Sequence, residues 1–264
     1  MIYINNQEKI TRLKLNSENF YVVADFDKTL TEGSSNSTWG VLSNANQVGN
    51  EYKEKRTALY NKYRPIEISQ EISEEEKSAA MDTWWQAHIN LFYEYGLKQD
   101  AIKNAIADGN LKYRHGAKEF LRKMYELNIP VIIISAGIGN IIEEFLKNEN
   151  DYYDNIKIVS NFISFENGII KEIIGETIHA LNKNIVKLDN DSKMLLENRE
   201  NILLLGDGLA DLKMVSKEKI ENTITIGFLD EKIEENLEYF NKEFDIVVTN
   251  QGSLDDVNNI LKIY

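Results

Sequence analysis

The chain has 264 residues, of which 42% are hydrophobic and 28% charged, and this composition excludes collagen-like and disordered classes while leaving room for one to two domains. Acidic residues outnumber basic ones by 43 to 30, and the net charge of −13 without a basic run argues against binding a nucleic acid polymer or an anionic membrane. Cysteine is absent, which excludes a thiolate nucleophile, a disulfide framework and a zinc–sulfur site.

The N-terminal half combines one short strand with helical sequence. Residues 21–24 are apolar and favour a buried strand that ends abruptly at Asp25. Residues 32–63 are rich in Ser, Asn, Lys and Glu, and their periodicity is weak. A capping box at residues 73–76 then predicts the start of a helix. We expect a further helix over residues 100–107 that ends at Asp108-Gly109-Asn110.

The C-terminal half alternates strands with helices. Helical periodicity over residues 120–127 precedes the apolar run 130–134, which is typical of a parallel strand covered on both faces. Asn140 is a candidate N-cap for a helix over 141–147. Asn167-Gly168 indicates a type I′ hairpin between residues 162–165 and 169–173. Further strands are expected at 156–160, 202–205, 223–226 and 246–248.

Alternating strands and helices indicate a doubly wound, Rossmann-like α/β core with a parallel sheet. The first core strand is separated from the next by about 80 residues of mainly helical sequence, which is too long for a crossover loop. An inserted, mainly helical cap domain explains this excursion. We therefore divide the chain into residues 1–31 (core, first part), 32–111 (cap) and 112–264 (core, second part).

Two carboxylates follow the first strand. Asp25 and Asp27 lie two residues apart, where α/β sheets bind ligands, and an extended backbone would turn both side chains the same way. Repulsion at that distance raises one pKa unless a divalent cation separates the charges. Taken alone, this motif is also compatible with an Asp-rich turn or a helix N-cap.

Three more polar clusters follow later strands. Ser135-Ala136-Gly137 offers a hydroxyl and consecutive N–H groups to an anion. Asp207 lies at a strand tip between two glycines, and Asp211 follows one helical turn later. Lys183 lies in the sequence between Gly137 and Asp207. Separately, these clusters are compatible with an ordinary turn, a helix cap and a surface lysine. Together they would converge on one crevice, and oxygen ligands without His or Cys suit Mg²⁺.

These clusters resemble the four ordered motifs of the haloacid dehalogenase superfamily, which is dominated by Mg²⁺-dependent phosphatases with an aspartyl-phosphate intermediate. A closer similarity is to the cytosolic pyrimidine 5′-nucleotidase family (type III), and it runs from about Tyr21 to the C-terminus, cap included. It is carried by residues 65–68, 84–88, 135–139, 159–162, 178–184 and 226–229. The sequence departs from the family pattern at Lys28, where an uncharged residue is usual, and at residues 208–210.

The resemblance implies roles for the core residues. Asp25 would be the nucleophile, and Asp27 would act first as general acid and then as general base. Asp25, the backbone carbonyl of Asp27 and Asp207 would bind Mg²⁺, while Asp211 would orient the metal ligands. The phosphate would be held by Thr29, Ser135, the Ala136 N–H and Lys183.

In the cap, the resemblance implies that Glu67 lies in the pocket for the base and accepts hydrogen bonds from base N–H groups. Trp84 or Trp85 would stack on the ring, and because adjacent helical residues point about 100° apart, only one can face the pocket squarely. The alternatives are that both tryptophans and His88 pack between cap and core, and that Glu67 is a surface charge.

The function implied is a Mg²⁺-dependent 5′-nucleotidase that acts on pyrimidine or 7-methylguanosine monophosphates. Alternatives are a phosphatase for phosphoserine or a sugar phosphate, a non-catalytic binding protein of the same fold, and phosphotransfer to an acceptor nucleoside. The longest apolar run, residues 129–134, is far shorter than the roughly 20 residues of a membrane span. We therefore expect a soluble cytoplasmic protein, with a monomer as the working expectation.

Overall fold

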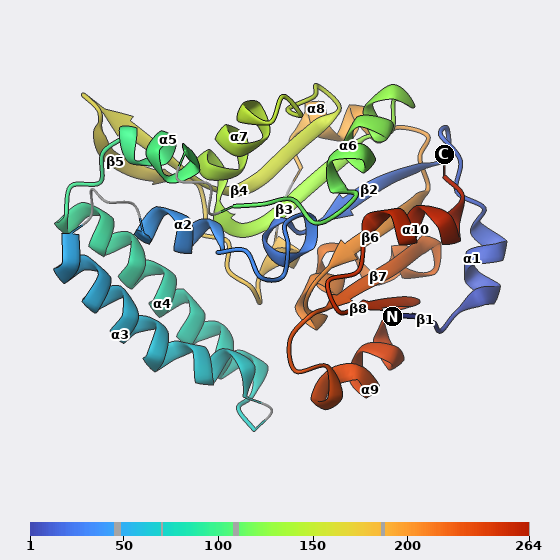
Figure 1. Cartoon of the computed structure of the whole chain (residues 1–264), viewed down its shortest axis with the longest axis horizontal. Coiled ribbons are helices and arrows are strands. Elements are labelled where there is room, and N and C mark those ends of the chain that lie inside the picture. Colours follow the sequence, from blue (N-terminus) through green and yellow to red (C-terminus); the bar gives the residue numbers. More distant parts are fainter. Residues whose placement is uncertain (45–48, 70, 108–110, 186–187, 264) are drawn as a thin grey trace.

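The computed structural model describes residues 1–264 except 45–48, 70, 108–110, 186–187 and 264. One sheet runs through the centre of the molecule (Figure 1), and its strand order is β1-β8-β7-β6-β2-β3-β4-β5. The edge strands β1 and β5 are antiparallel to their neighbours, and the strands between them pair in parallel. The strands span β1 (Ile2–Ile4), β2 (Phe20–Ala24), β3 (Val131–Ile138), β4 (Ile156–Glu166), β5 (Ile169–Ile174), β6 (Asn201–Gly206), β7 (Thr223–Leu229) and β8 (Ile246–Thr249).

The chain winds outward from β2 in two directions. It first builds β3 and β4 on one side, and then returns to the other side of β2 to build β6, β7 and β8. This confirms the predicted doubly wound α/β core. The winding reverses between β2 and β6, and the carboxyl ends of strands at such a switch point are where open α/β sheets bind ligands.

Both faces of the sheet are covered. Alternate residues of β2 separate the two sides, because Val22 and Ala24 join one hydrophobic cluster while Tyr21 and Val23 join the other. The first cluster includes residues of α1 (Gln7–Leu13), α6 (Ala117–Glu126), α7 (Gly139–Asn148) and α10 (Leu254–Leu261). The second includes residues of α9 (Ile233–Glu243). A short helix, α8 (Asn190–Leu195), precedes β6.

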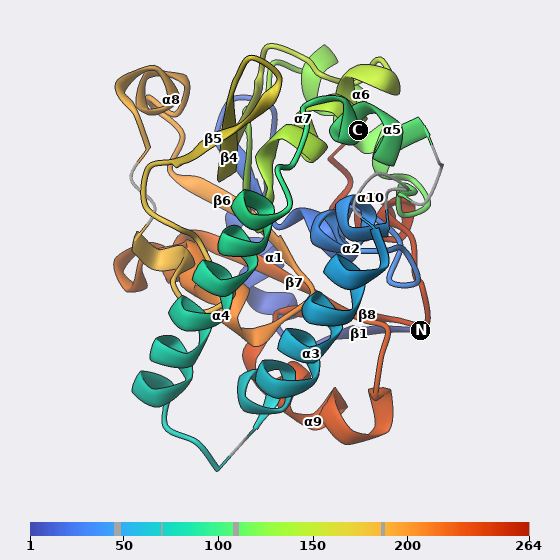
Figure 2. The ribbon, with the colours of Figure 1, turned by 90° about the vertical axis from the view of Figure 1, so that its left-hand side faces the viewer.

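A helical unit interrupts the core between β2 and β3, as predicted. It contains α2 (Thr38–Asn44), α3 (Gly49–Ile68), α4 (Glu74–Glu94) and α5 (Asp100–Ala107). Helices α3 and α4 lie side by side and project away from the sheet (Figures 1 and 2). An antiparallel bridge between Thr31 and Tyr113 brings the two ends of the unit together. The exact division at residues 31 and 111 stays our own prediction.

Several local predictions can be compared with the structure. The capping box at Ser73 and Glu76 is present at the start of α4. Asn167 and Gly168 both have positive φ, which fits the predicted type I′ turn. Asn140 is not an N-cap. It lies inside α7, and its side chain exchanges two hydrogen bonds with the backbone of Ile163 in β4.

Several elements near the N-terminus were not predicted, among them β1, α1, α2 and α3. The edge strand β1 is too short to carry a clear pattern. Helix α3 has only weak amphipathic character, and Tyr52 and Tyr63 are its buried residues. The predicted helix end at residues 108–110 falls outside the described residues. In the part of the chain that the structure describes, no helix combines the length and hydrophobicity needed to span a membrane.

Candidate active site

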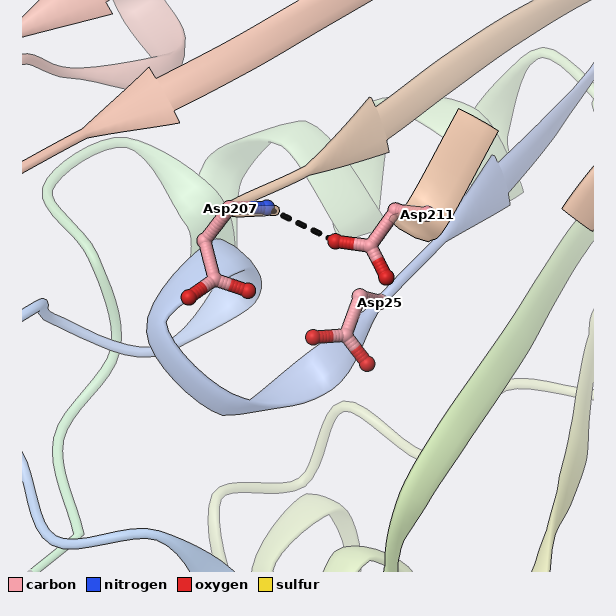
Figure 3. A group of neighbouring side chains, drawn as sticks. All are labelled: Asp25, Asp207 and Asp211. Atoms are coloured by element: carbon pink, nitrogen blue, oxygen red, sulfur yellow. Dashed lines mark hydrogen bonds between the residues drawn. The ribbon is translucent and has the colours of Figure 1, made fainter. Parts of the chain in front are cut away.

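Three carboxylates meet at the switch point of the sheet. Asp25 directly follows β2, and its N–H donates to Leu205 of β6 at 3.0 Å. Asp207 directly follows β6, and Asp211 lies in the 3₁₀ turn after it. Figure 3 shows the three carboxylates gathered around one point, and oxygens from each lie within 4.8 Å of one another. The predicted convergence of distant acidic residues is therefore present in the structure.

Lys183 reaches this cluster from the loop that follows β5. Its Nζ lies 2.7 Å from Asp25 Oδ1 and 2.7 Å from Asp211 Oδ1, and its side chain is 4% exposed. Burial alone would lower the pKa of Lys183, but the charges of Asp211 and Asp25 outweigh burial and raise this pKa above its ordinary value. The alternative of a surface lysine is therefore wrong.

Asp211 connects the lysine to the loop of Asp207. One carboxylate oxygen contacts Lys183, and the other accepts hydrogen bonds from the N–H groups of Asp207 (3.0 Å) and Gly208 (2.9 Å). Both oxygens are thus engaged in holding protein groups. This geometry supports an orienting role for Asp211, although that role stays a prediction.

The cluster carries more negative than positive charge. Burial raises the pKa of Asp25 even though Lys183 opposes the shift, and burial together with the charges of Asp211 and Asp25 raises the pKa of Asp207. Lys183 supplies one positive charge against these three carboxylates. Closely spaced, oxygen-only ligands with excess negative charge are the donor set that suits Mg²⁺, so the residues present fit this ion.

Asp27 faces a different group. Its carboxylate accepts hydrogen bonds from the Thr38 N–H at 2.9 and 3.2 Å and from Thr38 Oγ1 at 3.0 Å. Burial and then the charge of Asp25 raise the pKa of Asp27 to about 7. The sequence analysis expected repulsion to raise one of the two pKa values, whereas both are raised and burial is the larger cause. The Asp27 side chain is not part of the three-carboxylate cluster, so its predicted metal contact rests on its backbone carbonyl.

Thr38 was missed by the sequence analysis. It is the first residue of α2, and besides contacting Asp27 its Oγ1 accepts a hydrogen bond from the Ile138 N–H at 3.0 Å. Thr38 therefore joins the cap, Asp27 and the end of β3. The available signal was Ser37-Thr38 ahead of the apolar residues of α2, a pattern typical of a helix start.

A tight turn begins just after Asp25 and contains Asp27. Asp27 has φ −65° and ψ 126°, and Lys28 has φ 62° and ψ 3°, which are the angles of a type II turn. A wider loop encloses this turn, because the Thr31 N–H donates to the Phe26 carbonyl, five residues earlier, at 3.1 Å. Lys28, which departs from the family pattern, forms an ion pair with Glu231 at 2.7 Å.

The Ser135-Ala136-Gly137 segment lies beside Asp27. Ser135 is buried, and its Oγ accepts a hydrogen bond from the Gly137 N–H at 3.0 Å. A Cβ on Gly137 would lie 2.2 Å from Thr38 Oγ1 and 3.1 Å from Asp27 Oδ2, so this close approach requires glycine. The segment thus lies next to a proposed catalytic carboxylate, while its contacts with phosphate stay a prediction.

Thr29 follows the turn and is fully buried. Its hydroxyl has no hydrogen-bond partner among the residues that the structure describes. A buried hydroxyl without a partner is uncommon, but nothing in its surroundings identifies the group that it would contact. Phosphate binding by Thr29 therefore stays a prediction.

The two tryptophans of α4 face different neighbours. Trp85 donates its indole N–H to the Ala136 carbonyl at 3.1 Å, and Trp39 of α2 donates to the same oxygen at 2.9 Å. Trp84 instead stacks on Tyr63 of α3, with ring centroids 5.9 Å apart. Trp85 therefore packs between cap and core, as the alternative interpretation proposed. Trp84 packs within the cap.

Glu67 lies near the end of α3 and forms an ion pair with Arg64. Its side chain is 12% exposed, compared with 39% for Arg64, so the carboxylate is not a freely solvated surface charge. His88 is also buried, between the rings of Trp39 and Trp84 at centroid distances of 5.3 and 5.8 Å. The structure places Glu67 in the cap, and its contact with a base stays a prediction.

Comparison with solved structures agrees with this arrangement. The structure of cytosolic 5′-nucleotidase IIIB bound to cytidine superposes with a TM-score of 0.87 at 27% sequence identity, over 99% of this chain and 92% of that one. A substrate-bound phosphoserine phosphatase has a TM-score of 0.61 at 18% identity, over 94% of this chain and 99% of that one. The second likeness concerns the fold alone.

Sequence comparison gives the same result. The 7-methylguanosine phosphate-specific 5′-nucleotidase A of Xenopus laevis is 37% identical over 265 residues, which cover 97% of this chain and 91% of that protein. The human 7-methylguanosine phosphate-specific 5′-nucleotidase is 35% identical over 249 residues, which cover 91% and 83% respectively. The sequence profile of the pyrimidine 5′-nucleotidase (UMPH-1) family matches residues 25–264. The chain therefore belongs to the pyrimidine 5′-nucleotidase (UMPH-1) family, with a haloacid dehalogenase-type fold, and is a phosphoric monoester hydrolase of the 5′-nucleotidase class.

Proposed function

We propose that this 5′-nucleotidase hydrolyses pyrimidine or 7-methylguanosine nucleoside 5′-monophosphates, depends on Mg²⁺, and proceeds through a phosphoryl group held covalently on Asp25. The observation that carries this proposal is the contact of Lys183 with Asp25 and Asp211, together with Asp207, at the switch point of the sheet. Family membership and the named relatives support the choice of substrate class.

Asp25 would attack the substrate phosphorus with one carboxylate oxygen. Both reactants are negatively charged, so their charge must be neutralised before they approach. Lys183 contributes one cation, already in contact with Asp25 Oδ1. Bound Mg²⁺ would supply the remaining positive charge, held by Asp25, Asp207 and the carbonyl of Asp27, with Asp211 fixing the loop of Asp207.

Asp27 would donate its proton to the leaving nucleoside oxygen, and the resulting carboxylate would then take a proton from the water that hydrolyses the acyl phosphate. A pKa of about 7 allows one group to serve in both steps near neutral pH. Thr38 would orient this carboxyl group through its N–H and hydroxyl. Thr29, Ser135, the Ala136 N–H and Lys183 would hold the other phosphate oxygens.

The cap would recognise the base. Glu67 would accept hydrogen bonds from base N–H groups, and Trp84 is the better candidate for stacking because Trp85 is fixed to the Ala136 carbonyl. A cytoplasmic site of action would fit the cytosolic name of the matching solved structure. We further propose that the substrate is a free nucleoside monophosphate and that the working unit is a monomer.

The test is a phosphate-release screen with the purified chain. Cytidine, uridine and 7-methylguanosine monophosphates are compared with phosphoserine and sugar phosphates, each with Mg²⁺ and with EDTA. We expect release from the nucleotides, its loss in EDTA, and its recovery when Mg²⁺ is added back. Preferential hydrolysis of phosphoserine or a sugar phosphate, or turnover that EDTA does not affect, would contradict the proposal. Appearance of phosphate on an added acceptor nucleoside would instead reveal phosphotransfer.

A further inference from the structure

Arg114 is a buried arginine just behind the turn that carries Asp27. It follows Tyr113, whose bridge to Thr31 closes the cap insertion, and its side chain is 1% exposed. A guanidinium group has five N–H donors and always carries its charge, so its burial is costly unless acceptors surround it. The groups around Arg114 therefore indicate what it holds in place.

These acceptors come from three separate loops. Nε donates to the Thr29 carbonyl at 2.8 Å, and Nη2 donates to the Lys28 carbonyl. Nη1 donates to the Gly252 carbonyl after β8 at 3.0 Å, and Nη2 contacts Asp230 after β7 at 2.7 Å. Arg114 thus ties the turn after β2 to the ends of two neighbouring strands.

The far side of this contact is itself fixed. The guanidinium lies over the ring of Phe228 at 4.3 Å. The second oxygen of Asp230 accepts a hydrogen bond from the Gln251 N–H at 2.6 Å. A Cβ on Gly33 would lie 2.4 Å from Asp230 Oδ2, so the chain leading into the cap passes directly over this ion pair. Asp230 and Arg114 therefore form a rigid support beneath the turn and the first connection to the cap.

The turn needs such a support because of Lys28. This residue has φ 62°, in the left-handed region, at the turn position where glycine or asparagine is favoured. Its side chain makes an ion pair with Glu231, whose side chain is 61% exposed. The backbone here is held by the carbonyls of Lys28 and Thr29, which accept from Arg114, and by the Lys28 N–H, which donates to Thr31 Oγ1 at 2.8 Å.

We propose that Arg114 is a positioning residue, which holds Lys28 in its left-handed conformation and thereby aims Asp27 at the leaving group. The inference rests on the proposed function in one respect, the acid–base role of Asp27. Within the part of the chain that the structure describes, Arg114 contacts neither the three-carboxylate cluster nor Thr38, so its effect passes through the backbone of the turn.

The test combines two substitutions. Arg114→Met should lower kcat by about a hundredfold, because a misplacement of about 1 Å has that effect, while KM changes little. The loss of kcat caused by Arg114→Met should be at least tenfold smaller when it is measured in the Lys28→Gly variant than in the wild type. The reason is that glycine adopts positive φ without support. Arg122→Met, which removes an exposed arginine from α6, serves as the matched control and should retain wild-type kcat.

A second readout does not depend on activity. Amide hydrogen exchange of the peptide spanning residues 20–31 should be faster in Arg114→Met and slower again in the double variant. Should Arg114→Met fail to fold, Asp230→Asn, which weakens the same ion pair, takes its place. Unchanged kcat and exchange in a folded variant, or absence of rescue by Lys28→Gly, would overturn the inference. Lack of phosphatase activity in the wild type would refute the proposed function instead. The exchange measurement would still test whether Arg114 holds the turn in place.

Discussion

The strand-end site and the cap are built in different ways. At the strand ends, the parallel strands β2 and β6 bring Asp25 and Asp207 together, and Lys183 adds a buried ion pair with Asp25 and Asp211. In the cap, aromatic rings dominate, and the indole N–H groups of Trp39 and Trp85 donate to the core carbonyl of Ala136. The comparison teaches that sheet topology brings the carboxylate cluster together, whereas in the proposed function the choice of substrate would fall to the helices of the cap.

The largest effect should come from the nucleophile. Asp25→Asn keeps the size of the side chain but removes the attacking charge, so kcat should fall by about 10⁴-fold or more. Phosphate release and acid-stable trapping of the phosphorylated chain measure this loss. Asp191→Asn, at an exposed position of α8, is the matched control and should retain activity. Retained turnover in Asp25→Asn would assign the attack to another group.

The second-largest loss of kcat is expected for substitution of Lys183. Lys183→Met removes the ammonium that contacts Asp25 and Asp211, and loss of one preorganised cation typically lowers kcat by about 10²–10³-fold. The variant also leaves two buried carboxylates without their partner, so kcat is measured on protein shown to be folded by circular dichroism. Lys193→Met, exposed on α8, controls for loss of a lysine. A decrease smaller than tenfold would separate Lys183 from the chemistry.

The core could be predicted from the sequence because its signals are local and repeated. Apolar runs such as 130–134 define strands, and a polar residue directly after each run defines a strand end. Once the strands were taken as parallel, Asp25 and Asp207 had to meet at one edge of the sheet. The place of Lys183 followed only from the family resemblance, since a loop lysine carries no local signal.

The cap could not be predicted to the same depth. Helix α3 buries few residues, so its pattern is weak, and nothing local shows that Trp85 rather than Trp84 faces the core. Thr38 contacts Asp27, but the two residues are too far apart in the sequence for a motif spacing to predict this contact. Likewise, Asn140 resembles an N-cap until β4 lies next to it and offers the Ile163 backbone as a partner. These contacts depend on how elements pack, which a single sequence does not encode locally.

A third prediction concerns the cap's stability. Burial, followed by the charge of Arg56, lowers the pKa of His88 to about 4. The unfolded chain binds a proton near pH 6.5, so this contribution to stability is fully present above pH 6.5 and is lost as the pH falls toward 4. Its size is on the order of 3 kcal/mol. Urea unfolding at pH 7 and pH 4.5 should therefore show a smaller stability difference in His88→Gln than in the wild type.

The exposed His115 provides the control for this experiment. Its side chain is 80% exposed, so His115→Gln shows what the loss of a histidine outside the cap does to the same measurement. Equal pH dependence in His88→Gln and the wild type would mean that His88 is protonated as readily in the folded cap as in the unfolded chain. The burial of this ring between Trp39 and Trp84 would then not persist in solution.

The smallest effect should be the most selective. Glu67→Gln keeps the shape of the side chain and an oxygen that Arg64 can contact, but removes the negative charge. Loss of a charged hydrogen bond to the base should raise KM for a nucleoside monophosphate about tenfold. KM for p-nitrophenyl phosphate, which has no base, should not change. Steady-state kinetics with both substrates measure the difference, and Glu75→Gln, exposed at the start of α4, is the control.

The choice of nucleotide sharpens this last test. The base of 7-methylguanosine monophosphate carries a positive charge, whereas that of cytidine monophosphate is neutral, so removal of a carboxylate charge should raise KM more for the former. Arg64 already pairs with Glu67 and reduces the negative charge that a base would meet, which limits this difference. If Glu67→Gln raises KM equally for both nucleotides and for p-nitrophenyl phosphate, Glu67 does not contact the base, and recognition must come from the aromatic residues of the cap.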